Sequence, residues 1–333
     1  MPISQRFQML LLLPLLLTQA PGKDAEPGDY IRIHQTEDGE VQLQVAIREF
    51  VPGEDSPANS PALSLVGVTH IGEASYFQSI QTYLAGPEAV LFEGVGFYAT
   101  KEERRKRQPG AGKSKKKDFE GSSQHKMADA LGLTFQPLEI NYDKDNFYNS
   151  DLSMTEFLQY FQPGVKGSII SGEPGEDKEA RQFMSVMAGS SIAANIFQGV
   201  LRFFGQSPKL QGISRLVLIE TLGALGNDLS QADAMPESMA KLMKLIIQRR
   251  NRVVLQDLKI FLRRKDIGHL AIFYGAGHMP DLEKRICKTH GYNPAKDIWV
   301  TCFSVNPQKS GLTPLDINFV RKMVSHQIQL QSE

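Results

Sequence analysis

The sequence has little of several features that mark whole classes of protein. Only two of its 333 residues are cysteines, Cys287 and Cys302, so one disulfide can form at most, and two buried thiols are the alternative. Lys plus Arg and Asp plus Glu both number 37, so no net field attracts nucleic acid or an anionic membrane. After the N-terminal segment, no stretch approaches the roughly eighteen uncharged residues of a membrane helix. We expect a soluble body that does not bind nucleic acid.

The N-terminal segment has the parts of a secretory signal peptide. Arg6 precedes an apolar run from Leu10 to Leu17, and the small-x-small end Thr18-Gln-Ala20 follows it. The run is too short to span a bilayer. We therefore expect 1–20 to be a signal peptide and the protein to be exported, either to a periplasm or into the medium. An uncleaved N-terminus that anchors the chain in a membrane is the alternative.

The next segment, 21–62, contains a polar linker and a predicted β-ribbon. Residues alternate in period two from Tyr30 to His34 and from Val41 to Phe50, on either side of a turn at Gly39. This pattern predicts a hairpin at the edge of a sheet.

From 63 to 310, strand and helix patterns alternate in the manner of a parallel α/β sheet. A strand from Leu63, a helix to Leu84 and a strand from Ala89 form a βαβ unit, which predicts a parallel pair of strands. The later patterns predict a helix at 124–131, strands at 134–140, 268–274 and 297–305, and a helix at 280–290, so the βαβ format returns near the C-terminus. The predicted fold class is α/β, with a mixed, largely parallel sheet flanked by helices.

Two segments interrupt this pattern, and a tail helix at 311–333 follows it. The basic loop, 101–122, holds nine Lys or Arg residues against two Glu between Lys101 and Lys117. A solvated loop and a weak membrane-surface or phosphate-binding patch are its alternative readings, and the lack of interleaved aromatic residues favours the solvated loop. The helical insert, 151–265, has a capping box at Ser153 and predicted helices at 178–204, 214–225 and 235–265, the last with a break near Asn251.

The residues best suited to chemistry lie where predicted strands end. Gly67-Val-Thr-His70 and Gly275-Ala-Gly-His278 each end an apolar strand with Gly-x-x-His and precede a helix. Each motif should present an imidazole at the carboxyl end of a parallel strand, where open α/β sheets bind ligands. The glycines allow the chain to leave the strand tightly and another backbone to approach. Glu93 ends a third buried strand, and a carboxylate is costly there unless it has a partner.

Two histidines and a carboxylate on one rim suit two kinds of site. They can bind a metal ion with an open coordination position, or they can act as an acid–base set without a metal. A single strand-end histidine is more often structural, but the matched contexts of His70 and His278 favour a site. The sequence has no His-Glu-x-x-His, which excludes common zincin chemistry, and no Gly-x-Ser-x-Gly, which argues against a serine esterase of the usual kind.

The ordered set of two Gly-x-x-His motifs, Glu93, the Arg250-Asn251 pair and the segment from Phe273 to Pro280 resembles the TraB/PrgY/GumN family. That family is related to the Tiki metalloproteases and, more distantly, to erythromycin esterases and ChaN-like haem-binding proteins. The resemblance covers about residues 63 to 305. It implies an exported peptidase that depends on a divalent metal ion and acts on a peptide or protein.

The resemblance also implies roles for particular residues. His70, Glu93 and His278 would be metal ligands or acid–base groups, with Zn, Mn or Co as the metal. Arg250 would orient Glu93 or stabilise an oxyanion, and Asn251 would assist; a surface charge is the alternative for Arg250. Asp151 is a further candidate, although an acid before a capped helix needs no function.

Two rival functions use the same cleft. A metal-free hydrolase similar to the erythromycin esterases would use His70 as the base with Glu93 as its partner. A non-catalytic protein similar to ChaN would bind haem or iron. The sequence does not indicate an oligomeric state.

Overall fold

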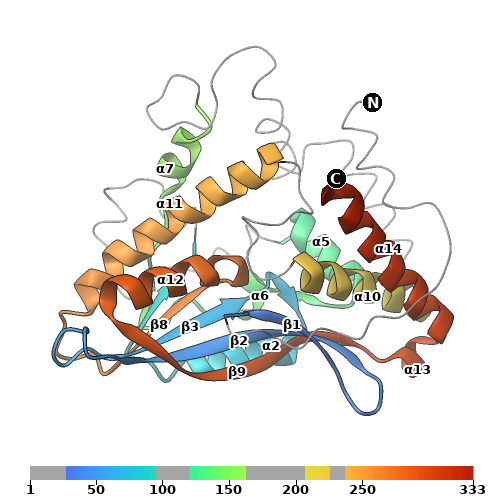
Figure 1. The fold of residues 1–333 in the computed structure, drawn as a ribbon, viewed down its shortest axis with the longest axis horizontal. Helices are drawn as coiled ribbons and strands as arrows, with labels where there is room; N and C mark the ends of the chain where they lie inside the picture. The colour runs from blue at the N-terminus through green and yellow to red at the C-terminus, as the bar shows by residue number, and fades with distance from the viewer. Residues whose placement is uncertain (1–27, 95–101, 103–119, 163–206, 226–236, 333) are drawn as a thin grey trace.

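One seven-stranded sheet organises the residues that the structure describes (Figure 1). The structure is a computed structural model, and it describes residues 28–94, 102, 120–162, 207–225 and 237–332. The strands of the sheet are β1 (Ile31–Gln35), β2 (Val41–Pro52), β3 (Ala62–Val68), β5 (Ala89–Phe92), β7 (Phe147–Asn149), β8 (His269–Gly275) and β9 (Tyr292–Val305). A separate two-stranded sheet pairs β4 (Ile71–Gly72) with β6 (Thr134–Phe135).

The seven-stranded sheet is mixed. Strands β3, β8, β5 and β7 lie in that order and run parallel to one another. Strand β2 is antiparallel to β3, to β1 and to β9. Four of the seven strands are therefore parallel, and helices cover the sheet, which confirms the predicted α/β fold class.

Three details of the sheet differ from the sequence prediction. The expected pair β3 and β5 is parallel, but β8 lies between the two strands. β9 does not join a parallel pair, because it is antiparallel to β2 along its whole length. The predicted hairpin is present as β1 and β2, and β1 is at an edge, but β2 has β9 on one side and β1 and β3 on the other. Eight of the ten β2 residues from Val41 to Phe50 are buried.

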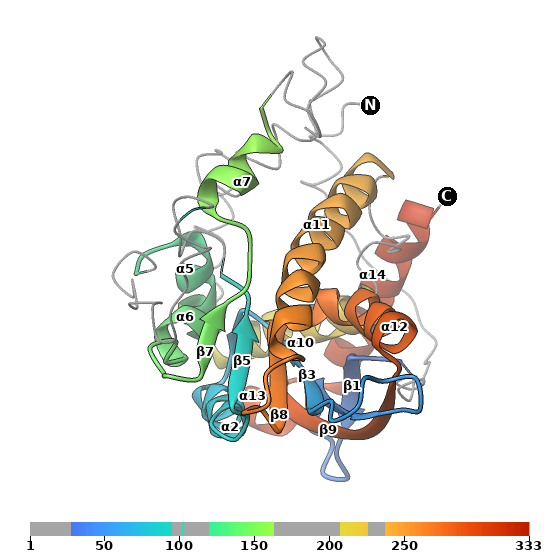
Figure 2. The same ribbon diagram turned by 90° about the vertical axis from the view of Figure 1, so that its left-hand side faces the viewer.

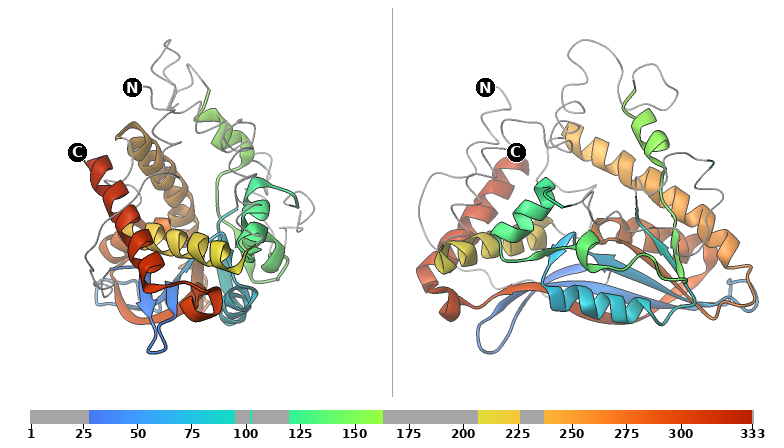
Figure 3. Two further views of the ribbon diagram at one scale, coloured as in Figure 1. Left: turned by 90° about the vertical axis from the view of Figure 1, so that its right-hand side faces the viewer. Right: turned by 180° about the vertical axis from the view of Figure 1, so that it is seen from behind.

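The helices lie in two layers on opposite faces of the sheet. On one face, α11 (Glu237–Phe261) and α12 (Met279–His290) pack on apolar side chains of β3, β5 and β8, and they lie beside each other (Figure 2). The other face is covered by α2 (Ala74–Leu84), α5 (Ser123–Ala130), α10 (Pro208–Leu225) and α14 (Pro314–Ser332). Figure 3 shows α10 and α14 side by side. The remaining helices are α6 (Gln136–Glu139), α7 (Met154–Gln159), η2 (Ala276–His278) and α13 (Pro307–Ser310).

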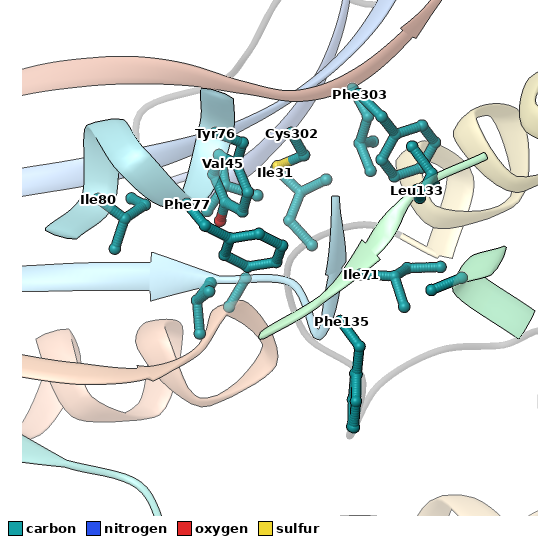
Figure 4. Close-up of a cluster of buried hydrophobic side chains, with 14 of the residues drawn as sticks. Ile31, Val45, Ile71, Tyr76, Phe77, Ile80, Leu133, Phe135, Cys302 and Phe303 are labelled. Carbon is teal, nitrogen blue, oxygen red and sulfur yellow. The ribbon is translucent and has the colours of Figure 1, made fainter. Parts of the chain in front are cut away.

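The core on the second face joins segments from both ends of the chain (Figure 4). Tyr76 and Phe77 of α2 meet Cys302 and Phe303 of β9, and each of the four side chains is at most 1% exposed. Full burial of one such large apolar side chain contributes roughly 1.5–3 kcal/mol to folding. Both cysteines are free thiols, so the alternative of a disulfide does not apply to this structure.

Two predicted elements have a different form. The strand expected at 134–140 ends at Phe135 and continues as α6, because Pro137 has no backbone N–H for a sheet and suits the first turn of a helix. The helix expected to break near Asn251 is continuous, since the Asn251 side chain bonds outside its own helix to His278 and Asp281. The capping box at Ser153 is present.

Several expectations fall on residues outside those described: the leader, nearly all of the basic loop, and the helix at 178–204. In the described part of the chain, no helix combines the length and the apolar character needed to span a bilayer.

Candidate active site

The three strands that carry the predicted site are neighbours in the sheet. Val68 of β3 pairs with Gly275 of β8, and Phe92 of β5 pairs with Phe273 of β8. The backbone N–H of Glu93 donates to Phe273 O at 3.0 Å, one residue beyond β5. Because the three strands are parallel, both motifs and Glu93 lie at the same carboxyl rim, as the sequence predicts. The first motif differs in one respect, since the short strand β4 precedes its helix.

The two motif glycines allow close approach at this rim. A Cβ atom on Gly67 would lie 2.8 Å from Val45 Cγ1 and 3.1 Å from Ala46 O, so β2 passes too near for a side chain. A Cβ atom on Gly275 would lie 3.2 Å from Glu93 Oε2. The same oxygen accepts a hydrogen bond from Gly275 N–H at 2.6 Å. Gly67 therefore serves packing, and Gly275 admits the carboxylate of Glu93.

Glu93 is an ionised carboxylate with a charged partner. Arg250 Nη2 lies 2.5 Å from Glu93 Oε1, and the Glu93 side chain is 12% exposed. Burial alone would raise the pKa of Glu93, but the charge of Arg250, with contributions from His278 and His70, lowers it well below its usual range. Glu93 therefore carries its charge at neutral pH and does not act as a proton donor.

Asp151 holds Arg250 from the other side. Its carboxylate accepts from Arg250 Nε at 3.1 Å and from Nη2 at 2.5 Å. It also accepts from the N–H groups of Gly94 and Leu152, at 3.0 and 2.7 Å. Asp151 is fully buried, so it is a partner of Arg250 and not an exposed acid before α7. Burial alone would lower the pKa of Arg250, but Asp151 and Glu93 raise it, so the guanidinium stays charged.

His278 is fixed in one tautomer. Asn251 Nδ2 donates to His278 O and to Asp281 Oδ2, at 3.2 and 2.8 Å, so its Oδ1 is the atom that accepts from His278 Nδ1–H at 2.6 Å. The other ring nitrogen, Nε2, lies 3.9 Å from Glu93 Oε1. Burial lowers the pKa of His278 to about 4, so the imidazole is neutral at pH 7 and Nε2 carries a lone pair.

His70 is the exposed member of the set. Its Nδ1 lies 2.9 Å from Gln136 Oε1, and Gln136 Nε2 donates to the hydroxyl of Tyr142 at 2.8 Å. His70 is near enough to Glu93 and His278 for its charge to influence the pKa of both. The structure thus brings together the predicted residues His70, Glu93, Arg250, Asn251 and His278, with Asp151 behind them.

The arrangement fits the predicted metal ion only in part. His278 Nε2 and Glu93 Oε1 are two potential ligand atoms at 3.9 Å, and each histidine has an oxygen acceptor at Nδ1, as metal-bound histidines do. Among the described residues, however, no three His, Cys, Asp or Glu side chains converge on one point that could hold a metal ion. Glu93 Oε1 is already paired with Arg250. In this arrangement the predicted three-ligand set is not assembled.

Sequence reasoning missed several residues around the site. Gln136 and Tyr142 hold His70, and the Tyr274 hydroxyl donates to Ser150 O at 2.5 Å next to Asp151. Ser150 also donates to Asp257 of α11. Pro137 was the one signal in the sequence, because a proline is typical of the first turn of a helix. The helix α6 begins at Gln136, the residue that bonds to His70.

Searches against protein-family models, curated proteins and solved structures found no match to this chain.

Proposed function

We propose that this chain is a hydrolase in which His70, Glu93 and His278 activate a water molecule for attack on a carbonyl group. The observation that carries the proposal is the 3.9 Å between His278 Nε2 and Glu93 Oε1. Both atoms are hydrogen-bond acceptors. The ring proton of neutral His278 is on Nδ1, which donates it to Asn251, so Nε2 has a lone pair, and Glu93 is ionised. A donor placed between these two atoms could bond to both, since Glu93 Oε1 has a lone pair beyond the one that Arg250 uses.

A water molecule is such a donor. It has two O–H donors, and an oxygen about 2.8 Å from each acceptor suits the observed separation. Such a water keeps both of its own lone pairs for attack: as its oxygen bonds to the carbonyl carbon, its proton passes to His278 Nε2. When the bond to the leaving group breaks, that group takes up a proton, which the exposed His70 can carry to it. The geometry therefore supports general-base catalysis of hydrolysis.

The remaining residues have supporting roles in the proposal. His70 is exposed, so it can transfer protons between the site and the solvent or the leaving group. Arg250 keeps Glu93 ionised and adds positive charge beside the point where an oxyanion forms. Asp151 holds the guanidinium in place through two contacts.

The substrate class in this proposal comes from the resemblance to the TraB/PrgY/GumN family. Members of its Tiki branch are peptidases, so we propose a peptide bond as the target and an ester as the second choice. The metal-free reaction is the version that the contacts of Glu93 favour, because Arg250 already occupies Oε1.

A divalent metal ion stays the second candidate, and one observation favours it. Asp151, Glu93 and Arg250 together have a formal charge of minus one in a mostly buried site, and this charge attracts a cation. His278 and Glu93 would supply two of its ligands, and His70 would have to approach for a third. Bound metal would polarise a carbonyl group and lower the pKa of a water molecule.

The proposal is tested by hydrolysis of a mixed peptide library and of p-nitrophenyl esters by the purified protein. Glu93→Gln keeps the shape of the side chain and removes its charge, so we expect turnover to fall about 100-fold or more. His269→Gln is the matched control, because His269 begins the same strand that leads to His278 but lies at the opposite end, bonded to Ser64. Equal turnover by Glu93→Gln and wild-type protein would contradict the proposal.

A further inference from the structure

Gln136 stands in the same relation to His70 as Asn251 does to His278. Gln136 is 5% exposed and lies at the junction of β6 and α6. Its backbone N–H donates to His70 O at 2.8 Å, and its side-chain Oε1 lies 2.9 Å from His70 Nδ1. The two residues are therefore joined through both backbone and side chain.

The small sheet explains why these residues meet. β4 begins directly after His70, and β6 ends directly before Gln136; Ile71 pairs with Phe135 across the two strands. This pairing fixes the backbones in register, so the Gln136 side chain faces the imidazole. A carboxamide buried this deeply is unfavourable unless its polar atoms are bonded, and here both ends are bonded.

The direction of the carboxamide determines the tautomer of His70. Gln136 Nε2 donates to the Tyr142 hydroxyl at 2.8 Å, and the Tyr142 ring is held among Phe92 and Phe147. With Nε2 directed at the Tyr142 hydroxyl, Oε1 faces His70, and because an amide oxygen can only accept, the donor in this orientation is Nδ1–H. The proton of a neutral imidazole is then on Nδ1, and the exposed Nε2 is an acceptor.

We infer that Gln136, oriented by Tyr142, is a positioning residue that holds His70 in the Nδ1–H tautomer so that Nε2 can accept a proton. The inference rests on the proposed function for its catalytic consequence, but the tautomer itself is independent of any activity. Both histidines of the site are then prepared in the same way, each by a carboxamide from a different element: Gln136 from the β6–α6 junction and Asn251 from α11.

The test is ¹⁵N NMR of the histidine side chains in the full chain, with the His70 signals identified by their loss in His70→Gln. Wild-type protein should show the Nδ1–H tautomer at His70. Gln136→Leu should move the proton to Nε2 and lower kcat about 10- to 100-fold, the usual effect of losing an outer partner, with KM within about twofold. Gln136→Glu keeps an acceptor at Nδ1 and should restore both the tautomer and most of kcat.

Gln44→Leu is the matched control, since Gln44 is a buried carboxamide, 8% exposed, bonded to Arg32 and Thr301 away from the site. It should change neither the His70 signals nor kcat. If Gln136→Leu does not fold, Tyr142→Phe replaces it and should give a mixture of tautomers, because the carboxamide can then rotate.

An Nε2–H tautomer in wild-type protein would overturn the inference, as would an unchanged tautomer in Gln136→Leu. Loss of kcat in Gln136→Glu equal to that in Gln136→Leu would also overturn it. A protein with the expected tautomers but no hydrolysis in any variant would contradict the proposed function and leave the role of Gln136 in positioning His70 supported.

Discussion

Asp151 and Arg250 form a two-contact ion pair in the interior of the protein, with Nε to Oδ1 at 3.1 Å and Nη2 to Oδ2 at 2.5 Å. The pair joins the end of β7 to α11, and Nη2 of the same guanidinium reaches Glu93 at 2.5 Å. The position of Glu93 at the rim therefore depends on Asp151, a buried residue behind Arg250 that we do not expect to touch a substrate.

Removing Asp151 should destabilise the fold strongly. Asp151→Ala leaves Arg250 with one carboxylate in a buried setting, and breaking such a pair reduces the free energy of unfolding by about 3–5 kcal/mol. Urea denaturation measures the change. The exposed pair of Arg264 and Asp266 is the control, and Asp266→Ala should change stability by less than about 1 kcal/mol. A loss at Asp151 no larger than at Asp266 would contradict this account of the pair.

The two motif glycines should respond differently to alanine. Gly67→Ala places a Cβ 2.8 Å from Val45 Cγ1, so we expect a loss of about 1–3 kcal/mol in stability from overpacking. Gly275→Ala places a Cβ 3.2 Å from Glu93 Oε2 and 3.8 Å from His278 Cδ2, so it should displace the carboxylate and lower turnover with a smaller effect on stability. Thermal unfolding and turnover of the two variants distinguish these effects. A stable, fully active Gly275→Ala protein would show that Glu93 does not need its present position.

The buried state of His278 should make stability fall in mild acid. Its pKa is about 4 in the folded protein against about 6.5 when exposed, so between these values the unfolded chain binds more protons. The stabilisation is fully present above about pH 6.5 and is lost as the pH falls to about 4, on the order of 3 kcal/mol in all. The free energies of unfolding of wild-type protein and His278→Gln should therefore converge as the pH falls through this window. Parallel curves for the two proteins would contradict a buried neutral imidazole.

The metal candidate is decided by the metal content of protein purified without chelators. Because Arg250 already pairs with Glu93 Oε1, we expect the protein to keep its turnover after dialysis against EDTA has removed any metal. Stoichiometric metal in wild-type protein that falls in both His70→Ala and His278→Ala would establish the metal site instead, since the loss of a ligand lowers metal content.

The residues at the carboxyl rim of the sheet could be predicted, because the sequence patterns that identify them are local. Each motif follows a run of apolar residues, and parallel strands bring their carboxyl ends together without any knowledge of strand order. The partner of Glu93 could also be anticipated, because an acid at a buried strand end requires one. The resemblance to the TraB/PrgY/GumN family, and no local pattern, pointed to Arg250 as that partner, and it lies 2.5 Å away.

Other parts of the site could not be predicted, since they depend on distant pairings. Asp151 lies before a capped helix, which explains an acid locally, and only the fold reveals a partner 99 residues later. β7, which carries the chain to Asp151, has three residues, too few for a period to appear. Gln136 meets His70 through a pair of two-residue strands, and no sequence pattern specifies such a pairing.

The most direct test of the central claim is kcat for Glu93→Gln, His278→Ala and the double variant, with folding checked in each. If both residues act on one water molecule, each single variant should lose about 10²–10⁴-fold in kcat, and the double variant should be little worse than either. A folded single variant with wild-type kcat, or losses that multiply in the double variant, would contradict a shared active site.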